Sequence, residues 1–460
     1  MSRLRSRTVA LCAMCTVGVM VLLAGCSSLG ARTTPEVDAA TLDMRSNPER
    51  YILVTVDNEP WAMQTRAGST TRGYDTAVRY KVSSRALATV QQLSTAYRLR
   101  EVNAWPIPAL RVHCVVFELP GEAEREAVLA RLRGEPGVRL AQPLQTFATA
   151  SSTADSTTGS TRVYNDPYLD LQRSLQQMAI PAAHRFSRGR GIRIAVIDTG
   201  VDTRHPDLAG RIAESHNFID RDQASFERDR HGTSVAGLIA ALAGNSEGIV
   251  GVAPEVKLIA LKACWQLDAA SDAAVCNSFT LAQAIAAAID ARANVINLSI
   301  AGPSDPLLEE LVTTADRGGV VVVGAVAPAG AAPAAAALAF PARAPGVIAV
   351  DVARPRSNPS SDIPAPGDDI FTLTPAGGYG FASGSSLATA QVSGVVALLL
   401  ARQRHLTSNQ VRALLAAGTE RMPTPQGELA SLNACAALAV MLGEGSCPGL
   451  LLARGKIAYK

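Results

Sequence analysis

The chain has 460 residues, of which 48% are hydrophobic and 4% aromatic, and its formal net charge at pH 7 is +3. This composition excludes a disordered or collagen-like chain, and the length predicts two or three domains with ample material for a large core. The small net charge, with no Lys/Arg-rich run, gives no support to nucleic-acid binding.

Residues 1–25 have the pattern of an export signal. Three arginines precede an apolar run over residues 9–23, which is too short to span a bilayer. The run ends in Leu23-Ala24-Gly25-Cys26, which resembles the lipobox of bacterial lipoproteins and predicts a lipidated Cys26. An ordinary signal peptide with an incidental cysteine is the alternative. Ser27 favours the outer membrane in Gram-negative bacteria, with the rest of the chain exported and anchored to the bilayer by lipid alone.

Residues 26–49 are polar and are predicted to form a tether, and residues 50–147 a small α+β domain of the ferredoxin-like, split βαβ type. The expected elements of this domain are a strand over 51–56, a helix over 84–97, a strand over 110–119, a helix over 121–133 and a strand over 138–147. Residues 148–164 are rich in Ala, Ser and Thr without apolar periodicity, which predicts a flexible, cleavable linker.

Apolar runs and helical stretches alternate from residue 165 to about residue 440. Near-continuous apolar runs lie at 194–197, 256–261, 295–300, 320–323 and 347–350, with helical spacing at 280–292 and 306–317. Fully apolar strands that alternate with helices predict a three-layer α/β/α domain whose mainly parallel sheet is covered on both faces. Ligands bind such a sheet at the carboxyl ends of its strands, where Asp198 is placed. Residues 441–460 are left as a C-terminal tail.

Two cysteine pairs, Cys264 with Cys276 and Cys435 with Cys447, are each twelve positions apart. In an oxidising compartment such close pairs predict local disulfides. A metal site is the rival interpretation, but no histidine is near either pair and the spacing does not suit a zinc knuckle. Cys114 lies in an apolar run and is predicted to be a small buried side chain.

Three short segments far apart in the chain carry the reactive groups of a nucleophilic triad. Asp198 ends one apolar run, whereas His231 and Ser386 each begin a helical one. A carboxylate, an imidazole and a hydroxyl are the groups that activate a serine for attack on a carbonyl carbon. Each residue alone would be interpreted as a strand end, a helix cap or a loop residue. Their joint occurrence favours the triad.

The motifs around these residues resemble those of the subtilisin-like (S8) serine peptidases over about residues 165–440. The matching blocks are I-D-T-G-V-D with H-P-D-L at 197–208, H-G-T-S-V-A-G at 231–237, and G-S-S-L-A with V-S-G at 384–394. The order and the gaps of 33 and 155 positions also match. The resemblance implies a subtilisin-like fold and a serine endopeptidase that cleaves protein or peptide substrates through an acyl-enzyme. It implies catalytic roles for Asp198, His231 and Ser386.

The resemblance also assigns the substrate-binding residues. Ser299, Ile300, Ala301 and Gly302 correspond to the edge strand that pairs with substrate backbone. The family has Gly at the position of Ala301, so the floor of the substrate subsite here is expected to differ from that of the family.

One departure from the family concerns the oxyanion hole. Pro328 stands where the family has an Asn whose side-chain amide binds the oxyanion, and no side-chain donor occurs from residue 319 to residue 340. Loss of one such donor in subtilisin costs about 10²–10³ in turnover. The Ser386 backbone N–H would remain as a donor, and Ser385 is expected to compensate in part through its hydroxyl. Pro328 favours the alternative function, a catalytically weakened homologue that binds peptides or acts as a regulatory protein.

The resemblance further implies a zymogen. Residues 50–147 have the length, place and element order of an I9-like propeptide, which would inhibit the enzyme as an intramolecular partner until cleavage between about residues 147 and 164. No cofactor is expected to be required. Calcium stabilises many family members, but no acidic loop clearly specifies a site, and Asp220, Asp222 and Asp229 are predicted to lie in a solvated loop.

Overall fold

The computed structural model describes residues 39–58, 82–120, 125–149, 164–220, 222–267, 273–327, 340–355, 362–424, 427–444 and 447. The predicted export signal with Cys26 lies outside the described residues, as do most of the predicted linker and Pro328.

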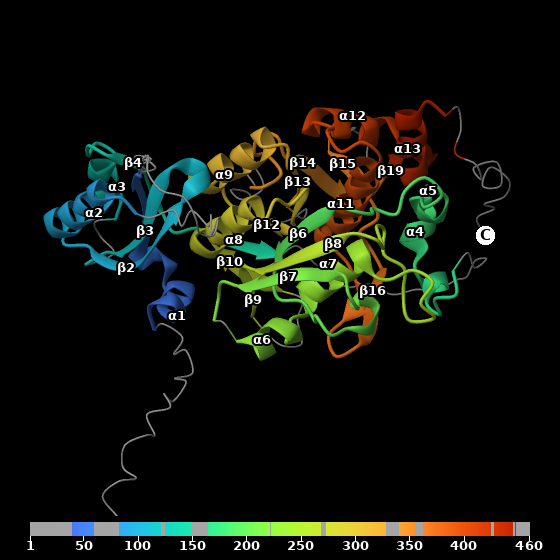
Figure 1. Ribbon diagram of the computed structural model, residues 1–460, viewed down its shortest axis with the longest axis horizontal. Coiled ribbons are helices and arrows are strands. Elements are labelled where there is room, and N and C mark those ends of the chain that lie inside the picture. The colour runs from blue at the N-terminus through green and yellow to red at the C-terminus, as the bar shows by residue number, and fades with distance from the viewer. Residues whose placement is uncertain are drawn as a thin grey trace, which may run out of the picture.

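The body of the molecule is built on a parallel sheet, seven-stranded among the described residues, with strand order β15-β14-β13-β11-β6-β8-β7 (Figure 1). The strands, in chain order, are β6 (Arg193–Asp198), β7 (Ile212–Asn217), β8 (Lys257–Lys262), β11 (Val295–Leu298), β13 (Val321–Ala325), β14 (Ile348–Val352) and β15 (Ile363–Ala365). The five central strands follow the predicted apolar runs. The two edge strands were not predicted, because β7 contains only half-buried and exposed residues and β15 is only three residues long.

Helices cover both faces of this sheet. On one face α7 (Arg230–Ala240) and α11 (Ser385–Arg402) contact the sheet, and on the other α8 (Ser278–Asp290) and α9 (Pro306–Arg317) do so. Among the described residues, α11 alone is long and apolar enough to span a membrane, but 89% of that helix is buried inside the fold. It is therefore a core helix. The α/β architecture expected from the sequence is confirmed.

The N-terminal ends of α8 and α9 are set by local capping residues. The side chain of Asn277 accepts a hydrogen bond from the Thr280 N–H (3.0 Å), and Asp305 accepts one from the Leu308 N–H (3.0 Å). Both caps satisfy amide groups that the first turn of a helix leaves without partners. Pro306 follows Asp305 directly, at a position where a missing N–H costs nothing.

Smaller elements surround the body. They are η4 (Leu169–Leu171), α4 (Arg173–Gln177), α5 (Ile180–Ala183), η5 (Pro206–Leu208), α6 (Gln223–Arg228), α12 (Ser408–Ala417) and α13 (Ala434–Leu442), with two hairpins formed by β16 (Ile370–Thr374) with β17 (Gly378–Ala382) and by β18 (Thr419–Thr424) with β19 (Gly427–Leu432). Both predicted disulfides are present, Cys264–Cys276 and Cys435–Cys447. Cys114 is a buried free thiol, as predicted.

The N-terminal region is a small antiparallel α+β unit with strand order β2-β3-β1-β4. Its elements are β1 (Tyr51–Asp57), α2 (Ser84–Tyr97), β2 (Arg100–Ile107), η2 (Pro108–Leu110), β3 (Val112–Glu118), α3 (Arg125–Leu132) and β4 (Val138–Pro143). The helix predicted over 84–97 is observed with those bounds. The segment predicted to be a tether instead contains α1 (Ala39–Ser46) and η1 (Pro48–Arg50), because Met44 is fully buried and anchors this stretch to the fold.

Each face of the small sheet has a different partner. Ile52, Val54 and Val56 pack with α2 and α3, whereas Tyr51 and Leu53 on the opposite face belong to the core that includes α8 and α9. Burial on both faces explains why β1 is a continuous apolar run rather than an alternating one. The two units are therefore packed together through a shared apolar core.

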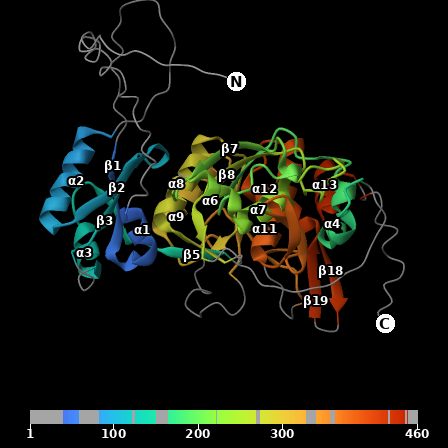
Figure 2. The same ribbon diagram turned by 90° about the horizontal axis from the view of Figure 1, so that it is seen from below.

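A short strand of the N-terminal region continues into the body. β5 (Thr146–Thr149) lies between β12 (Ile300–Ala301) and β10 (Ala274–Asn277), in a sheet of order β12-β5-β10-β9 that also contains β9 (Cys264–Gln266). β5 is antiparallel to both neighbours. Figure 2 shows β5 where the N-terminal region meets the body. The predicted linker therefore begins later than residue 148, since β5 extends to Thr149.

Candidate active site

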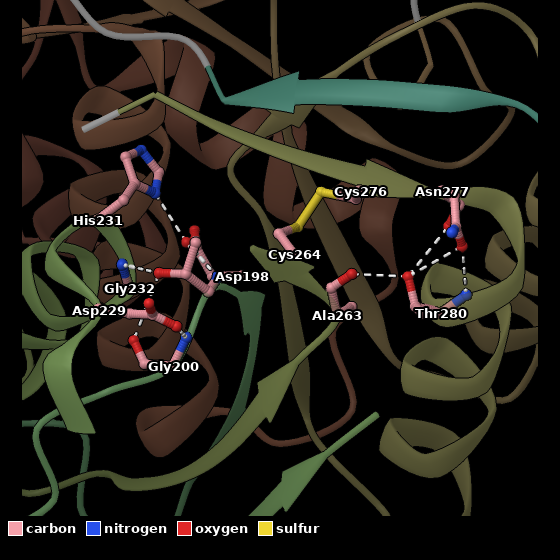
Figure 3. The surroundings of a disulfide bond; sticks show 11 residues. Asp198, Gly200, Asp229, His231, Gly232, Ala263, Cys264, Cys276, Asn277 and Thr280 are labelled. Carbon is pink, nitrogen blue, oxygen red and sulfur yellow. Dashed lines mark hydrogen bonds and ion pairs between the residues drawn. A yellow bond between two sulfur atoms is a disulfide. The ribbon is translucent and has the colours of Figure 1, made fainter. Parts of the chain in front are cut away.

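Asp198 and His231 meet at the carboxyl edge of the parallel sheet. Asp198 is the last residue of β6, and His231 is the second residue of α7. Their Oδ1 and Nδ1 atoms are 2.7 Å apart, and the exposed fractions of the two residues are 0% and 2%. Figure 3 shows the imidazole above the Asp198 carboxylate. Because the carboxylate can only accept, Nδ1 carries the hydrogen and the opposite ring nitrogen, Nε2, is the one that can act as a base.

The turn after Asp198 packs unusually close to the start of α7. The Gly232 N–H donates to Thr199 Oγ1 (2.9 Å), and the Asp202 N–H donates to Thr233 Oγ1 (2.9 Å). A Cβ added at Gly232 would lie 2.5 Å from the Gly200 carbonyl oxygen. The glycine in the H-G-T motif is thus required by the close approach of two backbones. This approach brings the Asp198 carboxylate within reach of the imidazole.

A buried ion pair, which sequence reasoning missed, lies beside the triad. Asp229 is 7% exposed and Lys262 is 2% exposed, and the Lys262 ammonium donates to Asp229 Oδ2. The same oxygen accepts a hydrogen bond from the Gly200 N–H (2.7 Å), as drawn in Figure 3. Burial raises the pKa of Asp229, against the opposing effect of Lys262 and the Gly200 N–H. The prediction that Asp229 belongs to a solvated loop is wrong, because Asp229 is buried and forms an ion pair with Lys262 at the end of β8.

Ser386 lies at the N-terminal end of α11 and is fully buried. Its carbonyl oxygen accepts a hydrogen bond from Ser299 Oγ (3.0 Å). Ser299 in turn accepts from Asn297 Nδ2 (2.9 Å), whose side-chain oxygen accepts from Ser393 Oγ (2.9 Å). This buried chain of hydrogen bonds ties the end of β11 to the first three turns of α11 and so fixes the position of Ser386. The side chain of Ser299, a residue predicted to bind substrate, thus contacts the backbone of the predicted nucleophile.

The predicted oxyanion residues are described only in part. Ser385 Oγ donates to the Val326 carbonyl oxygen (2.7 Å), so its single hydroxyl hydrogen is directed at that carbonyl. Pro328 lies two residues beyond Val326 and outside the described residues. The Ser386 N–H is among the first amides of α11 and lies at the positive end of the helix dipole.

The strands β12 and β10 lie on either side of β5, and the space between these two strands is called the groove. In this structure β5 fills the groove: Ile300 pairs with Thr149, Ala301 pairs with Ala148, and Cys276 pairs with Phe147. The Cys264–Cys276 disulfide joins directly opposed residues of β9 and β10, and Figure 3 shows the β5 strand (teal) crossing above it. The disulfide therefore braces one wall of the groove.

The Phe147 side chain occupies an apolar pocket beside the groove. Phe147 is 2% exposed, and its ring centroid is 5.8 Å from that of Phe340 in an edge-to-face arrangement. A Cβ added at Gly302 would lie 2.1 Å from Phe147 Cδ1. Gly302 also exchanges both backbone hydrogen bonds with Phe340, at 3.0 and 2.9 Å. The absence of a side chain at Gly302 therefore makes the pocket deep enough for an aromatic ring.

The described residues contain no group of three or more His, Cys, Asp or Glu side chains placed to hold a metal ion. Two carboxylates nevertheless lie against the loop at 244–249. Asp166 accepts a hydrogen bond from the Gly244 N–H (2.8 Å), and Asp207 accepts one from the Ile249 N–H (2.8 Å). Burial raises the pKa of Asp166, and the negative charge of Asp207 raises it further. A hard cation bound by oxygen ligands would offset this repulsion.

Known proteins match this chain over its α/β body. The model of the subtilase family, Peptidase_S8, matches residues 189–433. Thermitase of Thermoactinomyces vulgaris is 35% identical over 261 residues, which cover 55% of this chain and 89% of thermitase. The thermophilic serine proteinase of Bacillus sp. (strain AK1) is 31% identical over 379 residues, which cover 80% of this chain and 86% of that protein.

Solved structures share the fold. The crystal structure of fervidolysin from Fervidobacterium pennivorans, a keratinolytic enzyme related to subtilisin, superposes with a TM-score of 0.65 at 22% identity, covering 87% of this chain and 61% of that one. A protease of Pseudoalteromonas arctica superposes with a TM-score of 0.53 at 24% identity, covering 61% of this chain and 99% of that one. The sequence matches, which span most of both relatives, and the α/β body with its parallel sheet lead to one conclusion: the chain belongs to the subtilase family and is a serine endopeptidase that acts on proteins or peptides.

Proposed function

We propose that Asp198, His231 and Ser386 are the catalytic triad of this peptidase. The observation that carries the proposal is the 2.7 Å contact between Asp198 and His231 in a buried site at the sheet edge, at the end of a groove that holds a peptide strand. His231 Nε2 takes the Ser386 proton as the hydroxyl attacks the carbonyl carbon, and then donates it to the leaving amine. Asp198 holds the tautomer and stabilises the imidazolium.

A fluorophosphonate probe tests the nucleophile directly, since it reacts only with an activated serine. Wild-type protein is expected to be labelled and Ser386→Ala to remain unlabelled. Equal labelling of the two proteins would refute the assignment. The same probe tests the alternative function, that of a weakened homologue which binds peptides without turning them over. That alternative, favoured by Pro328, predicts no labelling of wild type, although Ser386 would be present.

The oxyanion is proposed to be bound first by the Ser386 N–H at the start of α11. Ser385 contributes only when its hydroxyl leaves the Val326 carbonyl oxygen, because one hydroxyl has one hydrogen to donate. Pro328→Asn, which restores the amide of the family motif, is expected to raise kcat by about 10²-fold. Ser385→Ala is the companion variant: an unchanged kcat would exclude any part for the Ser385 hydroxyl.

The N-terminal region is proposed to be an I9-like propeptide that inhibits the enzyme within the same molecule. Support comes from β5, which binds both groove strands through backbone pairing. Along β5 the chain runs from Ala301 toward Ile300, and Ser299 next to Ile300 bonds to Ser386. The direction of β5 therefore takes the chain toward the nucleophile as it leaves Thr149. The bond cleaved in maturation is placed after Thr149 and before Tyr164.

Contacts of charged and polar groups support a stable complex between the two units. Asp305, which is buried, accepts a hydrogen bond from Gln142 Nε2 (2.8 Å), and Gln142 Oε1 accepts from the Leu307 N–H (3.1 Å) at the start of α9. Trp105 packs edge-to-face on Phe279 of α8, with ring centroids 4.9 Å apart.

Expression of wild type should yield a processed chain, whereas Ser386→Ala should remain a full-length precursor. Identical processing of both would contradict self-cleavage.

We also propose that the chain is exported and anchored to a membrane by lipid on Cys26, as the lipobox-like segment predicts. Growth with a clickable fatty acid should label the wild-type protein and leave Cys26→Ser unlabelled. Calcium is proposed only as a structural ion, and its candidate ligands are the carboxylates of Asp166 and Asp207, which both lie against the loop at 244–249. A chelator should then lower the melting temperature of wild type but not that of Asp166→Asn.

A further inference from the structure

The Lys262–Asp229 ion pair lies where it can act on the triad without touching the substrate. Lys262 is the last residue of β8, and the parallel register pairs it with Asp198 at the end of β6. Asp229 immediately precedes α7, the helix that carries His231. Both members are buried, and neither belongs to the strands β10 and β12 that bound the groove.

The pair connects the two segments that supply Asp198 and His231. Asp229 Oδ2 accepts from Lys262 and from the Gly200 N–H, two residues beyond Asp198. The Asp229 carbonyl oxygen accepts from Thr233 Oγ1 (2.7 Å) within the first turn of α7. The lysine also donates to the Ser225 carbonyl oxygen (3.3 Å) of α6. One carboxylate thus holds the turn after Asp198 against the start of the helix that follows it.

We propose that Lys262 and Asp229 are positioning residues that hold the Asp198 turn against α7 and fix the net charge around His231. The inference rests on the proposed triad. A buried ion pair contributes little net stability compared with apolar side chains of the same shape, so stability alone does not account for it. Its charges, in contrast, act strongly at short range in a buried site.

The charges around the imidazole determine whether loss of Lys262 favours or disfavours the protonated form of His231. Asp198 and Asp229 act on one another as like charges, and Lys262 acts on Asp229 and on Asp220 as well. Arg230 adds a positive charge in the residue next to His231. Of these groups, Lys262 is the buried cation that offsets the second carboxylate. Without it, two uncompensated anions would stabilise the imidazolium. A smaller fraction of His231 would then be neutral and able to accept a proton at neutral pH.

The experiment measures the acid limb of the pH profile of kcat/KM, which reports the base of the free enzyme. Lys262→Met should raise the apparent pKa of that limb by about one unit, and Asp229→Asn should lower it by a similar amount, since a single charge within ~4–6 Å shifts a pKa by about 1–3 units and a more distant one by less. The double variant should return close to the wild-type value. KM for small peptides should change less than kcat, because the pair does not line the groove.

A matched control is available on the same strand. Lys257, the first residue of β8, is exposed and lies about 17 Å from Lys262 at ~3.3 Å per residue. Lys257→Met should leave the acid limb unchanged. If Lys262→Met, Asp229→Asn and the double variant all lose activity equally and keep the wild-type acid limb, the proposal is overturned. The pair is then a purely structural contact. If Lys262→Met does not fold, Asp229→Asn decides alone, because the amide oxygen still accepts from Gly200 and only the charge is removed.

Failure of this inference is distinguishable from failure of the proposed triad. Fluorophosphonate labelling that is lost in Ser386→Ala supports the triad whatever the acid limb does. An unshifted acid limb in an enzyme whose labelling depends on Ser386 refutes only the role of the pair. Lys262→Arg, which keeps the charge, should restore the wild-type acid limb even where its bulkier head group lowers the melting temperature.

Discussion

The pocket that holds Phe147 predicts a preference for an aromatic residue at the corresponding position of a substrate. In the processed enzyme, a peptide Phe-Ala-Thr-Ala, which repeats residues 147–150, should be cleaved faster than Ala-Ala-Thr-Ala. Phe147 is 2% exposed, so nearly the whole side chain is removed from water. Full burial of a phenylalanine is worth ~1.5–3 kcal/mol, which corresponds to a ratio of about 10–160 in kcat/KM.

Gly302→Ala tests whether this pocket is the cause. The added Cβ would lie 2.1 Å from Cδ1 and 2.7 Å from Cγ of the Phe147 ring, closer than atoms in contact can approach, so the ring must move out. The backbone hydrogen bonds of Gly302 to Phe340 do not involve a side chain and are retained. The cleavage of the alanine peptide should therefore change little, and the ratio between the two peptides should fall at least tenfold, toward one.

The assay is the release of a chromogenic amine from both peptides by wild type, Gly302→Ala and the control Gly380→Ala. Gly380 lies on β17, where an added Cβ would come no closer than 3.4 Å to any neighbouring atom, so the wild-type ratio should persist. Two results would refute the reasoning: a ratio near one in wild type, or a high ratio that survives in Gly302→Ala.

Three further predictions concern the triad, the contact between the two units and pH. Asp198→Asn should keep the melting temperature and lower kcat by about 10⁴, because an amide in that place favours the wrong imidazole tautomer; a loss below tenfold would contradict the role of Asp198. Gln142→Ala in a Ser386→Ala precursor leaves the buried Asp305 without one donor, and urea titration should show ~1–3 kcal/mol lower stability. Burial lowers the pKa of His184 to about 4. Between pH 6.5 and pH 4 the unfolded chain therefore binds a proton that the folded chain does not. The free energy of unfolding should fall by up to ~3 kcal/mol as the pH decreases over this interval. His184→Gln should flatten the dependence of melting temperature on pH over that interval, and an unchanged slope would assign it to other groups.

The pH prediction depends on a specific arrangement around His184. Its Nε2 lies 2.9 Å from the Val252 carbonyl oxygen, which can only accept, so Nε2 carries the hydrogen. Nδ1 lies 2.6 Å from the Tyr164 hydroxyl, which then donates to it. Both ring nitrogens are satisfied in the neutral form, and a proton on Nδ1 would break the second bond in a buried site.

Much of the body could be predicted from local patterns. The central strands are long apolar runs because both faces of the sheet are covered, and Pro306 with Asp305 sets the start of α9 where the sequence places it. The Cys264–Cys276 pair follows from a spacing that suits a short hairpin. The edge strand β7 was missed because its outer face is polar. The helix α1 was missed because its buried Met44 is flanked by the charged residues Asp43 and Arg45.

The order of residues indicates which reactive groups this site has: a carboxylate, an imidazole and a hydroxyl, each at the end of an element and within a chain that matches the subtilase family. The surroundings of these groups depend on the folded chain. Lys262 meets Asp229 because the register of β8 against β6 brings them together, and β5 enters the groove because an open edge of β12 accepts a strand. Such contacts join residues far apart in the chain, whereas hydrophobic periodicity and capping report only on near neighbours. The buried charge beside His231 therefore became visible only in the folded molecule.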